Sequence, residues 1–548
     1  MPGVGDALWW QRGVIYQIYP RSFLDRSGDG VGDLAGVLDK LDHVSDTLGA
    51  DAIWLSPFFP SPMADFGYDV SDYCDVDPLF GTLADFDRLL QASHARGLKV
   101  ILDYVPNHTS DQHPWFRGSR ASRDDPHRDW YIWRDPKPDG SPPNNWLSNF
   151  GGSAWELDPT TDQYYLHSFL KEQPDLNWRN PAVVWAMLDV LRFWLARGMD
   201  GFRMDTVHRI VKHPDLPDNP PNAGGRLLHK EVGAYDSQLH VYDKDHPDVH
   251  QVLRQFRQVL DAYSSTGSER VAIGEAHIYD PRQLVRFYGE QLDELHLPFN
   301  FGLLFAPWAA QAVRDSVERY NAALPHGAWP NYVLGNHDEA RIASRVGVDG
   351  ARLAMMLLLT LRGTPTLYQG DELGIQDVPI PPDKARDPWG KNVPGLNLGR
   401  DRARTPMPWT NEPNAGFCPP HIEPWLPLNP DFQTLNVACE LADPRSMLSL
   451  TRRLLALRRA STALSAGGYR SLDSPEECFV YLRQLEHEQR VVALNFGSQP
   501  RLVQIDGTVL LSSYLDREGS LPGELALRPA EGVIIAPVSG NVDGPIRA

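Results

Sequence analysis

The chain has 548 residues and a formal net charge of −19 at pH 7, and 42% of its residues are hydrophobic and 22% charged. This composition is typical of a soluble globular protein with roughly two to four domains. The strong negative charge argues against a nucleic acid or an anionic membrane surface as a partner. The four cysteines are too few and too scattered for a disulfide framework and form no C-x-x-C pair, so neither zinc nor redox chemistry is expected.

Neither the start of the chain nor its most apolar run predicts export or membrane insertion. The first residues, MPGVGDALWWQRG, do not show the basic and then apolar order of a signal peptide. The run LAMMLLLTL at 353–361 is far shorter than the roughly 20 residues that span a bilayer, so we expect a buried helix there. The sequence therefore predicts a cytoplasmic protein without a membrane partner, either a monomer or a homodimer.

Short apolar or β-branched runs alternate along the chain with segments in which apolar residues recur three and four positions apart. Two of these helical segments, LADFDRLLQASHARG and AVVWAMLDVLRFWLARG, end in glycine, as helices commonly do. Eight such runs separated by helices predict an α/β protein with a (β/α)8 TIM barrel rather than an open doubly wound sheet. The expected strands are 14–20, 52–57, 99–106, 201–205, 271–276, 295–301, 331–338 and 363–370.

Two long segments interrupt this alternation. A stretch rich in Pro, Asn, Asp and Trp runs from residue 107 to about 180, and another follows the last strand at roughly 371–435. Segments this long are usually functional or form small domains. From about residue 467 the pattern changes to short strands with turns, which predicts a small all-β domain. The predicted organisation is a barrel formed by 1–107 and 180–466, an inserted domain at 108–179 and a C-terminal antiparallel β domain at 467–548.

Polar residues cluster where the expected strands end. The third strand ends in Asp103, with Asn107 and His108 just beyond it, and the fourth carries Arg203 and Asp205. Glu275 ends the fifth strand, and Asn336, His337 and Asp338 end the seventh. Because reactive groups of such barrels lie at the carboxyl ends of the strands, three carboxylates should converge on one mouth.

Two carboxylates flanking one bond are what glycoside hydrolysis requires, one as the acid and the other as nucleophile or base. Arg203 lies two residues before Asp205 and should point to the same face, where its charge would keep Asp205 ionised. Glu275 follows apolar residues in VAIGEA, a setting expected to raise its pKa and to suit a proton donor.

Four motifs in this order, D-x-x-x-N-H from Asp103 to His108, then GFRMD, GEA and NHD, resemble the α-amylase superfamily, glycoside hydrolase family thirteen. The further motifs QPDLNW, FGYDVSDY, GTPTLYQGDE and GRDRARTPMPW are similar to the subfamily that contains α-glucosidase, oligo-1,6-glucosidase, dextran glucosidase and sucrose isomerase. The resemblance covers essentially the whole chain. It implies that the 108–179 insertion is domain B of that family and that the β-rich tail is domain C.

The resemblance also implies a role for each matching residue. Asp205 would be the nucleophile that forms a β-glucosyl-enzyme, Glu275 the general acid/base, and Asp338 the residue that binds the sugar 2- and 3-hydroxyls. Arg203 would orient Asp205, and Asp103 would hold Arg203. The residues expected to bind the glucose ring are His108 and His337 at its hydroxyls, Tyr68 stacking on it, and Asp65 and Arg400, assisted by Arg404, clamping its 4-hydroxyl.

The stretch DRSGDGVGD at 25–33 resembles the first half of an EF-hand loop, with Gly30 at the sharp turn. Gly36 stands where an EF-hand has its bidentate Glu, so the loop is not an EF-hand. In the subfamily this stretch implies a structural Ca²⁺ site, which a Mg²⁺ ion could also fill, and no organic cofactor is expected. The implied ligands are Asp25, Ser27, Asp29, the carbonyl of Val31, and Asp33.

Thr206, directly after the expected nucleophile, bears on which linkage is cleaved. In the subfamily, Val at this place tends to accompany α-1,6 preference and Thr or Ala α-1,4 preference, although QPDLNW also occurs in oligo-1,6-glucosidases. A β-branched residue that merely suits a strand is the competing interpretation. Phe150 and Phe299 are expected to line the aglycone side and to exclude water.

The sequence therefore predicts a retaining, exo-acting α-glucosidase that acts on short α-glucosides, prefers α-1,4 bonds and also transfers glucose. The alternatives are an oligo-1,6-glucosidase, or a transglucosidase or isomerase acting on sucrose or maltose. A non-catalytic structural or transport subunit is disfavoured because all three acids are present without a membrane span. A sugar-binding module is disfavoured because binding alone does not need a buried acid pair.

Overall fold

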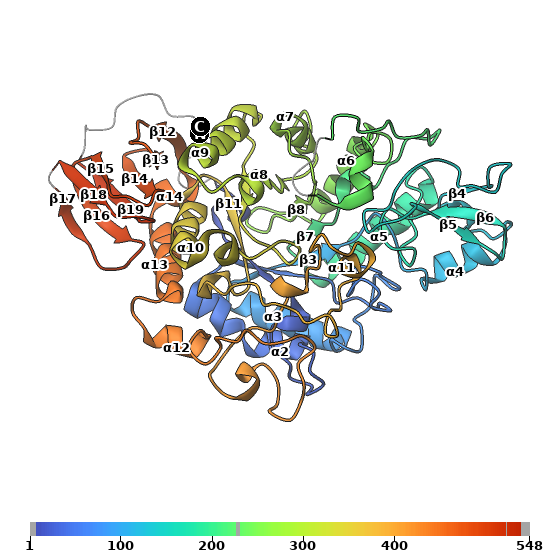
Figure 1. Ribbon diagram of the computed structural model, residues 1–548, viewed down its shortest axis with the longest axis horizontal. Coiled ribbons are helices and arrows are strands. Elements are labelled where there is room, and N and C mark those ends of the chain that lie inside the picture. The colour runs from blue at the N-terminus through green and yellow to red at the C-terminus, as the bar shows by residue number, and fades with distance from the viewer. Residues whose placement is uncertain (1–6, 226–230, 522, 539–548) are drawn as a thin grey trace.

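The computed structural model describes residues 7–225, 231–521 and 523–538. Its centre is a barrel of parallel strands, hydrogen-bonded in the order β10-β11-β1-β2-β3-β7-β8-β9 (Figure 1). A parallel bridge between Asn300 and Tyr332 joins the two end strands and closes it. The predicted (β/α)8 barrel is confirmed. Its strands are β1 Ile15–Ile18, β2 Ala52–Leu55, β3 Lys99–Tyr104, β7 Gly201–Met204, β8 Val271–Gly274, β9 Leu297–Pro298, β10 Asn331–Val333 and β11 Thr364–Tyr368.

The register of three neighbouring strands brings the predicted catalytic residues together. Asp103 on β3 lies opposite Arg203 on β7, and Met204 on β7 lies opposite Gly274 on β8. Because parallel strands in this register end level with each other, the residues that follow Met204 and Gly274 leave the sheet side by side. These residues are Asp205 and Glu275.

Helices surround the barrel and cover the outer face of its strands (Figure 1). Helix α3 begins with a capping box between Thr82 and Asp85, and α5 ends at Gly198, which has the left-handed φ of 108° that a glycine C-cap favours. The longer helices are α3 Leu83–Ala95, α5 Pro181–Arg197, α6 Val249–Ala262, α9 Ala310–Ala323, α10 Ile342–Thr360 and α13 Met447–Ala460.

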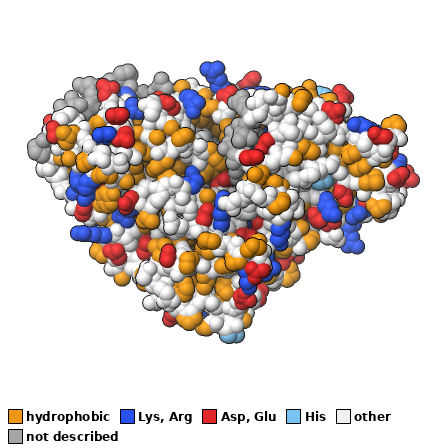
Figure 2. All heavy atoms as spheres, viewed as in Figure 1, with side chains coloured by type: hydrophobic (Ala, Val, Ile, Leu, Met, Phe, Trp, Pro, Cys, Tyr) orange, Lys and Arg blue, Asp and Glu red, His pale blue; other side chains and the backbone are white. Residues whose placement is uncertain are grey.

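The apolar run at 353–361 lies within and just after α10 and is buried throughout, so the predicted buried helix is confirmed. Over the described ranges, no helix combines the length and the apolar character that crossing a membrane demands. Figure 2 shows acidic and basic side chains interspersed with apolar ones over the face viewed.

The insertion expected after the third strand is present between β3 and β7. It contains α4 Pro114–Ala121 and a small sheet in the order β4-β6-β5, formed by Trp133–Arg134, Gln163–Leu166 and Trp155–Asp158, and it projects at the right of Figure 1. Its returning chain forms an antiparallel bridge between Asp175 and His108, so the insertion ends beside the barrel mouth.

The tail forms the predicted all-β region, at the left of Figure 1. One sheet has the order β12-β13-β14-β19-β16-β17, and β15 pairs with β18. The tail is fastened to α10, since the Arg352 guanidinium donates to the Ser513 carbonyl at 2.7 Å. Residues 1–6, 226–230, 522 and 539–548 of the predicted domains lie outside the described residues, and the domain limits stay predictions. The strands are β12 Gly468–Leu472, β13 Cys478–Leu485, β14 Glu488–Asn495, β15 Arg501–Gln504, β16 Gly507–Ser512, β17 Gly519–Leu521, β18 Glu524–Leu527 and β19 Gly532–Pro537.

Candidate active site

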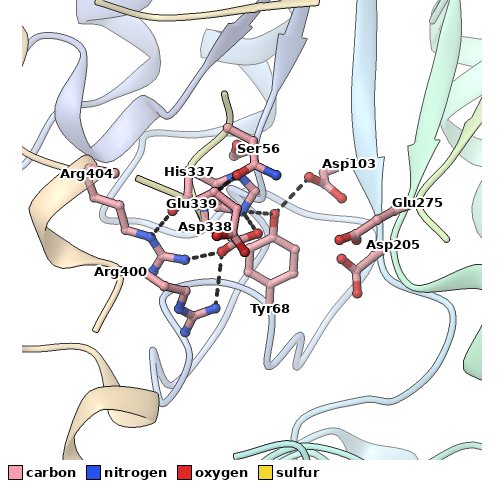
Figure 3. Close-up of polar contacts among 12 residues, drawn as sticks. Ser56, Tyr68, Asp103, Asp205, Glu275, His337, Asp338, Glu339, Arg400 and Arg404 are labelled. Carbon is pink, nitrogen blue, oxygen red and sulfur yellow. Dashed lines mark hydrogen bonds and ion pairs between the residues drawn. The ribbon is translucent and has the colours of Figure 1, made fainter. Parts of the chain in front are cut away.

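Asp205 and Glu275 lie together at the barrel mouth, and both are buried (Figure 3). The Arg203 guanidinium contacts both carboxylates. One of its nitrogens, Nη1, lies 2.8 Å from Asp205 Oδ1 and 2.8 Å from Asp103 Oδ1, and Nη2 contacts Glu275 Oε2. The predicted arrangement, in which Arg203 orients Asp205 and Asp103 holds Arg203, is therefore the one that the structure shows.

The pKa values of this pair differ from the sequence-based expectation. Burial raises the pKa of Asp205 well above its ordinary value, and the charges of Glu275 and Asp103 act in the same direction against Arg203. Burial would also raise the pKa of Glu275, but Arg203 and a hydrogen bond from His277 hold it well below its ordinary value. The two carboxyls hydrogen-bond to each other, so their titration belongs to the pair and not to either residue alone.

Both expected effects are present but outweighed: burial raises the pKa of Glu275 less than Arg203 and His277 lower it, and Arg203 lowers the pKa of Asp205 less than burial raises it. The apolar residues of VAIG precede Glu275 along the strand, but its side chain faces Arg203 and His277. Its carboxylate receives the closer donors, because His277 Nε2 lies 2.7 Å from Oε1. Asp205 accepts from Arg203 and from the hydroxyl of Thr206 at 3.1 Å, which does not offset its burial.

One end of the pocket is closed by a network of ion pairs. Arg400 Nη2 lies 2.6 Å from both Asp65 Oδ1 and Asp387 Oδ1, and its Nη1 lies 3.3 Å from Asp338 Oδ1. Arg404 Nη2 lies 2.7 Å from the same oxygen of Asp338. Burial raises the pKa of Asp338, but His337, Arg404 and Arg400 hold it well below its ordinary value, so this carboxylate is ionised. Figure 3 shows this network on the opposite side of Tyr68 from the catalytic pair.

Tyr68 lines the pocket between these two groups, and His337 lies behind it. The two rings are stacked with centroids 5.6 Å apart, and the Tyr68 hydroxyl lies 2.8 Å from His337 Nε2 and donates to Asp103 Oδ2 at 3.1 Å. The other ring nitrogen of His337 lies 2.7 Å from the Gln17 amide. Both nitrogens therefore have protein partners, with Nε2 also 3.2 Å from Asp338 Oδ2, and the predicted contact of His337 with a sugar hydroxyl stays a prediction.

His108 does line the pocket, next to Asp65. Its Nε2 lies 3.1 Å from the Gln173 amide, which also donates to Asp65 Oδ2 at 3.2 Å. Burial lowers the pKa of His108 to about 4, so the ring is neutral near pH 7 and can donate or accept. Gln173 belongs to the QPDLNW motif, which thus reaches the site through its first residue.

The two aromatic residues expected on the aglycone side have different fates. Phe150 lines the pocket with Trp389, whose ring centroid is 5.3 Å away. Phe299 does not line it: its ring packs inside the barrel, 5.6 Å from Trp54 and 5.9 Å from Phe301. The assignment of Phe299 was wrong because the chain after β9 turns this side chain into the apolar interior.

Thr206 lies beyond the strand, since β7 ends at Met204. It has φ 39° and ψ 41°, a left-handed conformation that is costly for a β-branched residue. In this conformation its hydroxyl donates to Asp205 and its backbone N–H donates to Glu275 Oε2 at 3.3 Å. The structure therefore excludes the interpretation that Thr206 is only a strand former.

The open end of the pocket is lined by residues that the sequence motifs did not indicate. Arg209 ends a 3-10 helix, η4 Val207–Arg209, and Tyr235 lies in another, η5 Gly233–Ser237. His277 could have been noticed, because it lies two residues after Glu275. Lys244 gave no such signal. The pocket is lined by Asp65, Tyr68, His108, Asn149, Phe150, Phe169, Asp205, Thr206, Arg209, Val232, Tyr235, Asp236, Lys244, Glu275, His277, Tyr279, Asp338, Glu339, Trp389 and Arg400.

The carboxylates of the predicted metal loop accept hydrogen bonds from backbone N–H groups of the same stretch. Asp25 accepts from the N–H groups of Gly28 at 2.6 Å and Gly30 at 2.8 Å, and Gly30 has the expected positive φ of 90°. Asp33 accepts from Gly36 at 2.7 Å, and Asp29 from Val31 at 2.8 Å. Within the described residues, no three acidic, His or Cys side chains converge on a metal position. The Ca²⁺ site stays a prediction.

A family model described as the α-amylase catalytic domain matches residues 17–467. This chain belongs to the α-amylase family. A relative from Rhizobium meliloti (strain 1021), described as a probable α-glucosidase, is 43% identical over 94% of this chain and 96% of its own length. An oligo-1,6-glucosidase from Parageobacillus thermoglucosidasius is 37% identical over 96% of this chain and 98% of its own length. The predicted family, its α-glucosidase subfamily and the prediction of a glycosidase are confirmed.

Solved structures agree with this assignment. An α-glucosyl transfer enzyme, XgtA, superimposes with a TM-score of 0.90 at 41% identity and covers 97% of this chain and 100% of that chain. The trehalulose synthase MutB from Pseudomonas mesoacidophila MX-45 gives a TM-score of 0.87 at 36% identity, with 97% and 100% covered. The protein is thus a glycoside hydrolase of this family, and its substrate is a glycoside.

Proposed function

We propose that this glycosidase is a retaining, exo-acting α-glucosidase that removes glucose from the non-reducing end of short α-glucosides. The observation that carries this proposal is the closed end of the pocket. Arg400 clamps Asp65 and Asp338 there, beside the Asp205 and Glu275 pair. A pocket with one blind end and the carboxyl pair in its wall accepts a single terminal sugar, whose leaving group points to the open end.

The carboxyl pair suits two-step displacement. The hydrogen bond within the pair lets the proton pass from Asp205 to Glu275 as a substrate binds. Asp205 then attacks the anomeric carbon while Glu275 protonates the departing oxygen, which gives a covalent glucosyl-enzyme. In the second step Glu275 takes a proton from a water molecule, which attacks the same carbon and releases Asp205. The two inversions retain the α configuration.

Asp338 supports this chemistry electrostatically. The transition state develops positive charge on the sugar ring, and an ionised carboxylate stabilises it. Arg404 and Arg400 keep Asp338 ionised and fix its position. We assign the binding of the ring hydroxyls to Asp338, His108, Asp65 and Arg400, because these side chains line the blind end.

We further propose a preference for α-1,4 bonds. Thr206 places a hydroxyl at the pocket wall, hydrogen-bonded to Asp205, where a valine would place a methyl group. Similar proteins carry both names, α-glucosidase and oligo-1,6-glucosidase, so similarity does not decide which linkage is preferred. An oligo-1,6-glucosidase is therefore the nearest alternative.

Transfer of glucose to an acceptor other than water is the second candidate function, either as a side activity or as sucrose or maltose isomerisation. Two observations favour it. The names of XgtA and MutB describe transfer and isomerisation. Phe150 and Trp389 form an apolar wall on the pocket, which lowers the access of water to the glucosyl-enzyme.

A cytoplasmic location also belongs to this proposal and is supported by four cysteines that are all unpaired, as is usual in a reducing compartment. The state of assembly, monomer or homodimer, is proposed on no structural observation. Cell fractionation tests the former, and sedimentation of the purified chain tests the latter.

Product analysis tests the proposed activity. The protein is incubated separately with maltose, isomaltose, sucrose and trehalose, and all products are chromatographed while the first-formed anomer is followed by NMR. We expect maltose to be cleaved fastest and α-glucose to appear first; β-glucose as the first product would rule out retention. Asp205→Asn should abolish turnover, with circular dichroism as the check that it folds.

A further inference from the structure

We propose that the open end of the pocket is built to hold an anionic group on the aglycone, such as a carboxylate or a phosphate, through Arg209 and Lys244. This inference rests on the proposed function and concerns the substrate class of the same site. The blind end of the pocket takes the glucose, so whatever is attached to it must lie towards the open end. Residues there decide which aglycones are accepted.

Arg209 and Lys244 both border this end, around the ring of Tyr235. The Arg209 guanidinium carbon lies 5.7 Å from the ring centroid and the Lys244 ammonium 6.0 Å from it. Arg209 Nη2 also donates to the Tyr235 hydroxyl at 2.8 Å. A second cavity is also lined by Tyr235, Lys244 and His277, so these side chains border both cavities.

These two cations differ from every other cation discussed for this site, because no described carboxylate lies within the 4.0 Å of an ion pair with either one. Arg203 has three carboxylate partners, and Arg400 also has three. The ammonium group of Lys212 lies 2.6 Å from Asp175 Oδ2. Arg209 is only 5% exposed and donates one hydrogen bond, to a neutral hydroxyl.

Buried charges normally have an ion-pair partner. Two like charges that face a substrate pocket without such a partner, as Arg209 and Lys244 do, therefore cost folding free energy. Consistent with this, burial and then the charge of Arg209 lower the pKa of Lys244 to about 8. The acidic side chains nearest to these two cations lie beyond ion-pair distance, although the charge of Asp243 raises the pKa of both Arg209 and Lys244. Asp236 accepts the Val232 N–H at 2.7 Å, and Asp243 lies 2.7 Å from His240 Nδ1. An anion on the aglycone would supply the missing partner.

The residues around Tyr235 that carry Arg209 and Lys244 are also held in place by contacts with one another. His240 stacks on the Tyr235 ring with centroids 3.6 Å apart, and the backbone N–H of Asp245 donates to the His208 carbonyl at 2.6 Å. This last bond ties the segment that carries Lys244 to the 3-10 helix that carries Arg209. Preorganised charges of this kind bind an anion without first having to be ordered.

Matched substrates test the inference. Maltitol and maltobionate carry the same glucose on a six-carbon aglycone that differs only in a hydroxymethyl group against a carboxylate. 2-O-α-glucosylglycerol and its 3-phosphate form the second pair and separate phosphate from carboxylate. We expect kcat/KM for at least one anionic member to exceed that of its neutral partner by about tenfold, the factor that one charge-assisted hydrogen bond contributes.

Lys244→Met keeps the side-chain stem, removes the charge and should bring this ratio close to one. Lys244→Glu should favour the neutral substrate. Lys137→Met, at an exposed lysine outside the pocket, is the matched control and should keep the ratio. Because each ratio compares two substrates on one preparation, a partly misfolded variant does not distort it.

The outcomes separate the two proposals. If neither maltose nor maltitol is cleaved, the proposed function is wrong. If maltitol is cleaved but no anionic partner is preferred, or if Lys244→Met leaves the preference unchanged, the anion site is wrong and the α-glucosidase stands.

Discussion

His277 offers the most direct test of how the catalytic acid is tuned. Its Nε2 lies 2.7 Å from Glu275 Oε1, and the charge and hydrogen bond of His277 both lower the pKa of Glu275. The substitution His277→Phe keeps an aromatic ring beside Phe301, 5.0 Å away, and removes the N–H donor. The variant therefore isolates the hydrogen bond from the packing.

The magnitude follows from the geometry. A hydrogen bond to a charged group contributes about 1.5–3 kcal/mol, and the His277 side chain is 31% exposed, so the lower figure applies. Losing the bond therefore removes about 1.5 kcal/mol of stabilisation from the ionised form of Glu275 and raises its pKa. The sign is fixed because the donor stabilises the ionised form. Since Glu275 and Asp205 share a hydrogen bond, the measured value belongs to the pair.

The assay is the pH dependence of kcat/KM for maltose. With the pKa of Asp205 raised and that of Glu275 lowered, the acidic limb reports the protonation of Glu275, so in His277→Phe it should move to higher pH. His277→Gln retains a donor and should restore part of the shift. His326→Gln, at an exposed histidine, should match the parent. An acidic limb at the parental pH in His277→Phe would refute the assigned role of this contact.

Three further changes test other parts of the site. Arg400→Lys cannot reproduce the two-pronged guanidinium contact with Asp65 and Asp387. Because breaking a buried ion pair costs about 3–5 kcal/mol, the variant should melt at a lower temperature in a fluorescence assay. An unchanged melting temperature would contradict this. Thr206→Val loses the hydroxyl that donates to Asp205 and should shift the ratio of the maltose rate to the isomaltose rate towards isomaltose. Thr206→Ser keeps a hydroxyl and should leave this ratio unchanged. Equal ratios in the two variants would show that Thr206 does not determine the linkage preference. If the 25–33 loop binds Ca²⁺, a chelator should lower the melting temperature of the parent but not of Asp29→Asn, and the prediction fails if the parent is unaffected.

The sequence alone determined the barrel and the convergence of the proposed catalytic acids. Strand and helix patterns are local, and a residue at the end of a parallel strand must point to the barrel mouth wherever the chain goes next. Asp205 and Glu275 follow β7 and β8 directly, so their convergence could be predicted from position.

Only the tertiary structure decided the environment of these groups. The pKa order of the pair depends on His277 and on Arg203, which reaches Glu275 across 72 positions of sequence. His337 contacts the hydroxyl of Tyr68, which comes from a loop 269 positions away.

The same reason explains the residues that the sequence did not reveal. Arg209 and Lys244 look like ordinary surface charges in the sequence, because their lack of a carboxylate partner is a property of the folded neighbourhood. Phe299 could not be distinguished from Phe150 by its type, and its direction was set by packing against Trp54. Local pattern thus fixed where each side chain leaves the backbone, while contacts distant in sequence fixed its charge state, its exposure and its partners.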